Sequence, residues 1–200
     1  MPRTQYYTAV SLDGYIADPD NSLDWLFAAG SSATKEDRFR AFFSRVGAMT
    51  MGATTYQWVL EHDQLLHDPR KWRAYYGATP CWVFTHRALP EVPGANLRFV
   101  HGDVQDVHRQ MAEAAGGKNV WLVGGGDLAS QFADRGLLDD LLLSVAPVVL
   151  GGGAPVLPRR LPGPALTLRA VEDDGSFVFL SYQVAGSRQT APPSATSRTR

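Results

Sequence analysis

The stretch Val120-Trp-Leu-Val-Gly-Gly-Gly-Asp-Leu-Ala-Ser-Gln-Phe132 runs from apolar residues through three glycines into an amphipathic segment. Residues 119–123 predict a buried strand, and residues 128–135 predict a helix. Glycine lets a ligand approach the backbone closely, and a helix N-terminus presents free N–H groups to an anion. The stretch therefore predicts a phosphate-binding turn at the carboxyl end of a strand, or else a tight turn in which Asp127 caps the helix.

A second junction of the same kind lies between Met49 and Tyr56. Residues 48–51 predict a short buried strand, Gly52 follows, and residues 54–61 predict a helix. The hydroxyls of Thr54 and Thr55 suit either a phosphate or an ordinary helix cap. Two such junctions in one sheet favour a ligand with two phosphate positions, such as a dinucleotide. Neither junction has the G-x-G-x-x-G pattern, so a standard Rossmann site is not predicted.

The remaining elements alternate between strands and helices. Phe39, Phe42, Phe43 and Val46 recur at helical spacing and predict a helix over 34–46. Another helix is predicted over 104–115, and further strands over 5–10, 81–85, 97–100, 141–149, 165–171 and 177–184. This order predicts an α/β fold with a mostly parallel central sheet, helices on both faces and an antiparallel C-terminal edge hairpin.

The length and charge of the chain limit the number of domains and the class of partner. The 200 residues, 44% hydrophobic and 20% charged, suit one globular domain over residues 1–185. Residues 186–200 hold three arginines but no acid, aromatic or large aliphatic residue, which predicts a disordered polar tail. Subtracting those arginines from the net charge of −1 leaves −4 for residues 1–185, which argues against a nucleic-acid partner.

Other classes of protein and site are also disfavoured. Apolar runs stay far below the length of a membrane span. The single cysteine, Cys81, lies in an apolar strand and is expected to be an inert core residue; no internal disulfide can form. We expect a cytoplasmic protein. The five histidines lack H-E-x-x-H or C-x-x-C partners, so no metal site is predicted.

Four segments together resemble a known family: Ser11–Ala17 (S-x-D-G-x-I-A), Met51–Tyr56 (M-G-x-x-T-Y), Val83–Thr85 (V-F-T), and Val123–Leu128 with Pro147–Gly153. They are similar in order and spacing to the dihydrofolate-reductase-like superfamily. The resemblance is closer to the reductase domain at the C-terminal end of bifunctional riboflavin-biosynthesis deaminase–reductases, and to its stand-alone bacterial relatives. It covers residues 4–184 and implies the three-layer dihydrofolate-reductase-like fold.

The resemblance implies an NADPH-dependent reductase that transfers a hydride to a C=N or C=O of a small heterocyclic or sugar-derived substrate. The cofactor would lie across the carboxyl ends of the strands. The implied cofactor-binding residues are Ala9 and Ile16 at the nicotinamide; Gly52, Thr54 and Thr55 on one side of the pyrophosphate; Val123, Gly124, Gly125, Gly126, Asp127, Leu128 and Ala129 on the other; and Thr85, His86 and Arg87 at the adenosine 2′-phosphate. Ala53 stands where the family usually has an arginine, so NADH is not excluded.

The catalytic acid is placed only by counting back from the M-G motif, which gives Glu36. A carboxylate on the apolar stripe could relay a proton, but a solvated glutamate in the first helical turn is the competing interpretation. Asp13, Asp24 and Trp25 are predicted to line the substrate site, within a lid over residues 12–28. Asp13-Gly14 is equally a turn signal. Without an acid, water or the substrate would supply the proton.

Two functions remain open. The chain lacks the H-x-E and P-C-x-x-C ligands of the zinc deaminase half, so a stand-alone reductase with a different substrate is favoured. The alternative is a nucleotide-binding or regulatory module without turnover, which Ala53 and Asp127 keep open. The resemblance also implies a homodimer that pairs through the C-terminal strands.

Overall fold

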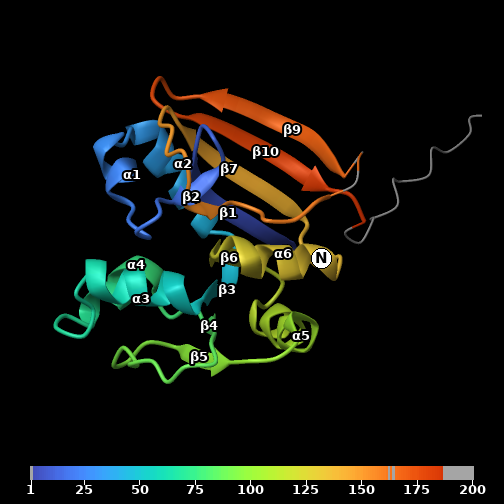
Figure 1. Cartoon of the computed structure of the whole chain (residues 1–200). Helices are drawn as coiled ribbons and strands as arrows, with labels where there is room; N and C mark the ends of the chain where they lie inside the picture. The colour runs from blue at the N-terminus through green and yellow to red at the C-terminus, as the bar shows by residue number, and fades with distance from the viewer. Residues whose placement is uncertain (1, 162, 164, 187–200) are drawn as a thin grey trace, which may run out of the picture.

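One eight-stranded sheet organises the chain (Figure 1). The computed structural model describes residues 2–161, 163 and 165–186. The strand order is β5-β4-β3-β6-β1-β7-β10-β9. The strands span β1 Thr4–Ser11, β3 Val46–Gly52, β4 Cys81–Phe84, β5 Leu97–Val100, β6 Asn119–Gly124, β7 Asp140–Ala146, β9 Leu166–Asp173 and β10 Val178–Val184. The first six strands in that order pair in parallel, whereas β10 is antiparallel to both β7 and β9. The predicted mostly parallel sheet with an antiparallel edge hairpin is confirmed.

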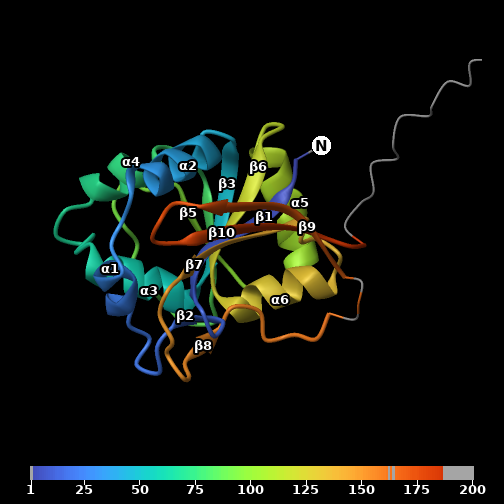
Figure 2. The same cartoon turned by 90° about the horizontal axis from the view of Figure 1, so that it is seen from above.

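Helices cover both faces of this sheet, as the alternating pattern predicted. They span α1 Asp24–Ala28, α2 Ala33–Phe43, α3 Ala53–His62, α4 Arg70–Tyr76, α5 Val104–Ala114 and α6 Gly126–Asp134. Met111 and Phe132 place α5 and α6 in one core with Leu122 of β6. Tyr56 and Trp72 place α3 and α4 in a second core, on the opposite face. In Figure 2, α2 and α6 lie on opposite sides of the β9–β10 hairpin, which completes the three layers.

Several predicted boundaries were wrong for local reasons. The helix predicted over 34–46 ends at Phe43, because Val46 already begins β3 and pairs with Asn119. The strand predicted over 141–149 ends at Ala146, since Pro147 has no N–H for the ladder. Asp127 is not the cap of α6: Gly125 is the N-cap, and Asp127 lies in the first turn. The helices α1 and α4 and the two shortest strands were not predicted from the sequence.

Those two strands form a small flap beside the main sheet. β2 (Tyr15–Ala17) pairs with β8 (Ala154–Pro155), joining the segment after β1 to the segment after β7. We call this pair the β2–β8 flap. Gly153, with φ of +128°, passes so close to the flap that a Cβ would lie 2.1 Å from the carbonyl oxygen of Ala17. Only glycine fits at this position, so Gly153 is required for close packing against the flap.

Three further expectations concern membrane spans, the cysteine and the C-terminal tail. None of the helices within residues 2–161 and 165–186 is long and apolar enough to cross a membrane. Cys81 is fully buried, and burial raises the pKa of its thiol, as expected for a core cysteine. The tail predicted over 186–200 lies outside the described residues except for Gly186.

Candidate cofactor and substrate site

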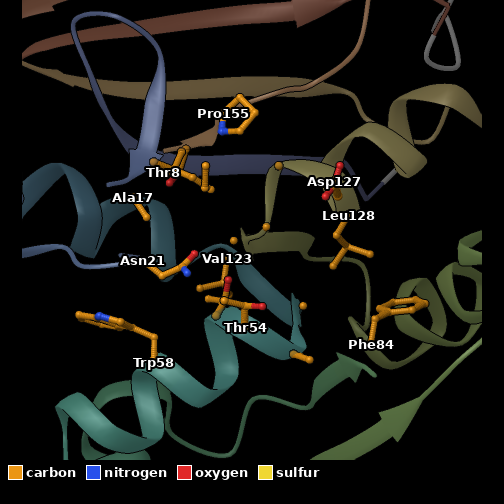
Figure 3. A pocket seen from close by; sticks show the side chains of 18 of the residues that line it. Thr8, Ala17, Asn21, Thr54, Trp58, Phe84, Val123, Asp127, Leu128 and Pro155 are labelled. Atoms are coloured by element: carbon orange, nitrogen blue, oxygen red, sulfur yellow. The ribbon is translucent and has the colours of Figure 1, made fainter. Parts of the chain in front are cut away.

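A cavity of about 640 Å³ opens where the parallel strands end (Figure 3). Such a volume suits a sizeable organic ligand. The floor comes from the carboxyl ends of β1, β3, β4 and β6, and one wall comes from the β2–β8 flap. The lining residues are Thr8, Ile16, Ala17, Asn21, Leu23, Gly52, Ala53, Thr54, Thr55, Trp58, Phe84, Val123, Gly124, Gly125, Gly126, Asp127, Leu128, Gln131, Ala154, Pro155 and Pro158.

Two helix N-termini meet in the middle of this cavity. Gly52 is the N-cap of α3, and Gly125 is the N-cap of α6. Neither helix has a side-chain cap hydrogen bond, so backbone N–H groups of both first turns remain for a ligand. A Cβ built on Gly125 would lie 3.9 Å from the nitrogen of Gly52, which shows how closely the two ends approach. Together they form an anion cradle with two positive dipole ends.

The glycines of the cradle are needed for different physical reasons. Gly125 has φ of +98°, which other residues adopt only with strain. A Cβ on Gly124 would lie 2.9 Å from the Thr55 hydroxyl oxygen, and one on Gly126 would lie 2.1 Å from the Pro155 carbonyl oxygen. Gly52 differs, because its φ is −79° and open space surrounds its Cβ position. Among these glycines, Gly52 is therefore the one at which a side chain would project into open cavity.

Most predicted cofactor residues come together here. The structure places ten of them in the lining: Ile16, Gly52, Thr54, Thr55, Val123, Gly124, Gly125, Gly126, Asp127 and Leu128. Ala9 is outside the lining; its neighbour Thr8 is inside, because successive strand residues point to opposite faces. Ala129 belongs to α6 and is buried in the hydrophobic core.

Thr85, His86 and Arg87 also lie outside the lining, directly after its residue Phe84. The Thr85 hydroxyl accepts a hydrogen bond from the backbone N–H of Arg87 at 2.9 Å, which shapes this loop. The Arg87 guanidinium is exposed and has no ion-pair partner among the residues that the structure describes. It is available to a phosphate near the Phe84 end of the cavity.

The predicted acid and substrate residues are not part of the cavity lining. Glu36 is exposed in the first turn of α2, where its carboxylate accepts a hydrogen bond from Ser31. Asp24 is exposed at the start of α1, and Trp25 is half-buried beside it. Asp13 holds two loops together: its carboxylate accepts hydrogen bonds from the Ser11 hydroxyl and from the N–H groups of Leu150 and Gly151. These contacts agree with the interpretation of Asp13-Gly14 as a turn.

Sequence reasoning missed several lining residues. Thr8, Asn21, Leu23, Trp58 and Phe84 belong to this group. The alternation along β1 could have indicated Thr8, since Tyr6 and Val10 flank it on the same face. Nothing in the local sequence marks Asn21 or Trp58, because the packing of α1 and α3 brings them to the cavity. Asp127 is the one ionisable side chain among the described lining residues.

Comparison with known proteins agrees with this architecture. The chain is 28% identical over 180 residues to the uncharacterised protein YwjB of Bacillus subtilis, covering 90% of this chain and 97% of that protein. The crystal structure of a putative riboflavin biosynthesis protein from Shewanella sp. PV-4 superposes with a TM-score of 0.74 at 25% identity, covering 91% and 98% of the two chains.

A bifunctional enzyme shares the fold more distantly. It is the diaminohydroxyphosphoribosylaminopyrimidine deaminase/5-amino-6-(5-phosphoribosylamino)uracil reductase of Thermotoga maritima, with a TM-score of 0.60 at 19% identity. The match covers 92% of this chain but 56% of that protein. The sequence model of the RibD C-terminal domain matches residues 63–180, which is more than half of the chain. The chain therefore belongs to the RibD C-terminal domain family.

Proposed function

We propose that this protein is an NAD(P)H-dependent reductase, with NADPH as the favoured cofactor. It would transfer a hydride to a C=N or C=O of a small heterocyclic or sugar-derived substrate. The anion cradle carries the proposal: N-caps Gly52 and Gly125 bring two free helix ends together at the carboxyl ends of adjacent strands. Two such ends suit the two phosphates of a dinucleotide.

The lining residues fit such a cofactor in their chemistry. The first turns of α3 and α6 would bind the pyrophosphate through backbone N–H groups, with the Thr54 and Thr55 hydroxyls beside them. Ile16 and Val123 offer apolar surface for a nicotinamide ring. When bound, the nicotinamide supplies the hydride, while the chain orients the reactants and excludes water. Asp127 is the one ionisable side chain among the described lining residues and lies in the first turn of α6, beside the proposed pyrophosphate site, so we propose that water or substrate provides the proton.

Direct binding measurements test the cofactor assignment. Trp58 lies in the cavity lining, so NADPH should quench tryptophan fluorescence or accept energy from it. A protein that gives no signal with either NADPH or NADH at millimolar concentration would not be a nicotinamide reductase. Oxidation of NADPH, followed by its absorbance against a panel of carbonyl and imine compounds, then tests turnover.

The preference for NADPH over NADH depends, in this proposal, on Arg87. A guanidinium binds phosphate through two parallel hydrogen bonds, and Arg87 is exposed next to the Phe84 end of the cavity. Arg87→Ala should lower the NADPH-to-NADH affinity ratio by about tenfold or more. The control is Arg73→Ala, on α4 and outside the cavity lining, which should keep the ratio. An unchanged ratio in both variants removes Arg87 from the cofactor site.

A second candidate function is a nucleotide-binding module without turnover. The specific observation in its favour is Asp127, whose carboxylate lies in the first turn of α6 inside the cradle, where it opposes an anionic ligand. The two functions separate experimentally. A module binds NADPH but leaves it unoxidised with every substrate of the panel, whereas a reductase consumes it with at least one.

A further inference from the structure

The cavity has two ends with different chemistry (Figure 3). Phe84 and Leu128 lie together on one side of the view, and Asn21 and Trp58 lie on the other. The Phe84 end continues into Thr85–Arg87, the predicted adenosine side of the cofactor. The Trp58 end is therefore left for the substrate. Thr8, Asn21 and Trp58 lie on this side of the cavity (Figure 3).

The Trp58 indole is held in place by neighbouring rings. It stacks on His62 of the same helix, with centroids 4.4 Å apart and an interplanar angle of 15°. Phe27 of α1 stacks on His62 in turn, at 4.8 Å and 5°. Trp58 itself is half-buried and lines the cavity. An indole fixed in this way offers a flat surface on which a planar ring can stack.

Asn21 supplies a neutral hydrogen-bonding group next to this surface. Its backbone is in the left-handed region, with φ of +60°. The turn is fixed by the Asp18 carboxylate, which accepts hydrogen bonds from the N–H groups of Asp20 and Ser22. The Asn21 side-chain amide makes no hydrogen bond within the described chain. A carboxamide can donate and accept at once, which matches the edge of a lactam-type heterocycle.

Cations are missing from the substrate end. No lysine, arginine or histidine occurs among the described residues that line the cavity, and Asp127 is its one ionisable group. The anion cradle already accounts for one anionic ligand, the cofactor. A second phosphate would thus enter a cavity that already holds the cofactor phosphates and offers no positive side chain among its described lining residues to bind it.

We infer that the substrate is an uncharged, planar heterocycle with a lactam-type edge and no phosphate group, stacked on Trp58 and hydrogen-bonded by Asn21. This inference rests on the proposed reductase function and narrows its substrate class. It separates this protein from the Thermotoga maritima enzyme, whose reductase substrate is named as a phosphoribosylaminouracil.

A matched pair of ligands tests the inference without turnover. Phosphoribosylaminouracil and its dephosphorylated form, ribosylaminouracil, differ only in the phosphate. Equilibrium dialysis measures the dissociation constant of each, with and without saturating NADPH. With NADPH saturating the anion cradle, the neutral compound should bind at least about tenfold more tightly than the phosphate. Equal affinity, tighter binding of the phosphate, or binding of neither compound overturns the inference.

Three variants locate the effect. Leu23→Lys adds a cation at the cavity lining and should move the affinity ratio toward the phosphate by about tenfold, whereas the matched neutral change Leu23→Met should keep it. Trp58→Ala should weaken both ligands alike, and Trp58→Phe should restore most of the affinity. Thermal melting of each variant checks that the chain is folded.

The two hypotheses fail in different ways. If NADPH neither binds nor is oxidised, the reductase function is wrong, yet the effect of Trp58→Ala on binding of the neutral compound still reads out the substrate end. If NADPH binds but the phosphate compound is preferred, the reductase function survives and the neutral-substrate inference is wrong.

Discussion

A Cβ atom on Gly125 would lie 3.9 Å from the backbone nitrogen of Gly52, although Gly52 ends β3 and Gly125 directly follows β6. The pairing of β3 with β6 brings them together, because Met51 lies opposite Gly124 in the sheet. The cradle is thus a product of strand order. Its two glycines should nevertheless respond differently to substitution.

Gly52→Val should weaken NADPH binding about 10- to 100-fold while the chain stays folded. The φ of −79° suits valine, and the side chain would project into open cavity where the pyrophosphate is proposed to bind. Fluorescence titration and thermal melting measure the two effects. Gly152→Val, at another glycine that lies outside the lining, is the matched control and should bind NADPH normally. Gly125→Ala should instead destabilise the fold by about 1–3 kcal/mol, since its φ is +98°.

Asp127→Asn should change ligand affinity and stability in opposite directions. Removing a negative charge from the cradle should tighten NADPH binding several-fold at low salt, with less effect at high salt. The same change removes a favourable charge from the first turn of α6 and should cost about 0.3–1 kcal/mol of stability. Asp106→Asn, in the first turn of α5, should show the stability loss alone. If Asp127→Asn binds NADPH no more tightly than the parent protein, Asp127 is remote from the ligand.

Asp13→Asn should remove part of the acid sensitivity of the fold. The hydrogen bond from the Ser11 hydroxyl, followed by those from the Leu150 and Gly151 N–H groups, lowers the pKa of Asp13 from 3.8 to about 2. A depressed pKa in the folded state gives stability that is present above pH 3.8 and lost as the pH falls toward 2. Thermal melting across this window should show a shallower decline in the variant than in the parent.

Leu168→Glu should abolish self-association. The outermost strand, β9, exposes Leu166, Leu168 and Val171, which lie opposite Val184, Tyr182 and Leu180 of β10 and therefore share one face. This apolar face supports the homodimer that the family resemblance implies. Sedimentation should find a dimer for the parent and a monomer for Leu168→Glu. Thr167→Glu, on the other face of β9, should remain dimeric; a monomeric parent protein would contradict the proposal.

The strand-to-helix junctions could be read from the sequence because they depend on local chemistry. An apolar run, a glycine and an amphipathic segment specify each of the two junctions at Gly52 and Gly124–Gly126, and the structure has both. The strand predicted over 97–100 likewise agrees with β5. These signals span only a few residues, so no long-range contact is needed to produce them.

Other features depend on packing between distant segments. Which face of β1 meets the cavity decides between Thr8 and Ala9, and a shift of one residue reverses the answer. Trp58 and Asn21 reach the cavity only because α3 and the turn before α1 converge. Glu36 was placed by counting back from the M-G motif; the last turn of α2 packs Phe42 on Tyr7, whereas Glu36 in the first turn faces solvent. Its catalytic role remains a prediction.

The pairing of β3 and β6 also links ligand supply to the lifetime of the folded chain. Because the cradle exists only when these two strands are adjacent, a nucleotide held there binds the native state and not the unfolded one. A ligand at 100 times its dissociation constant then adds about 2.7 kcal/mol to the free energy of unfolding. With the proposed nicotinamide cofactor as that ligand, the resistance of the protein to heat and proteolysis would rise with the logarithm of the free cofactor concentration.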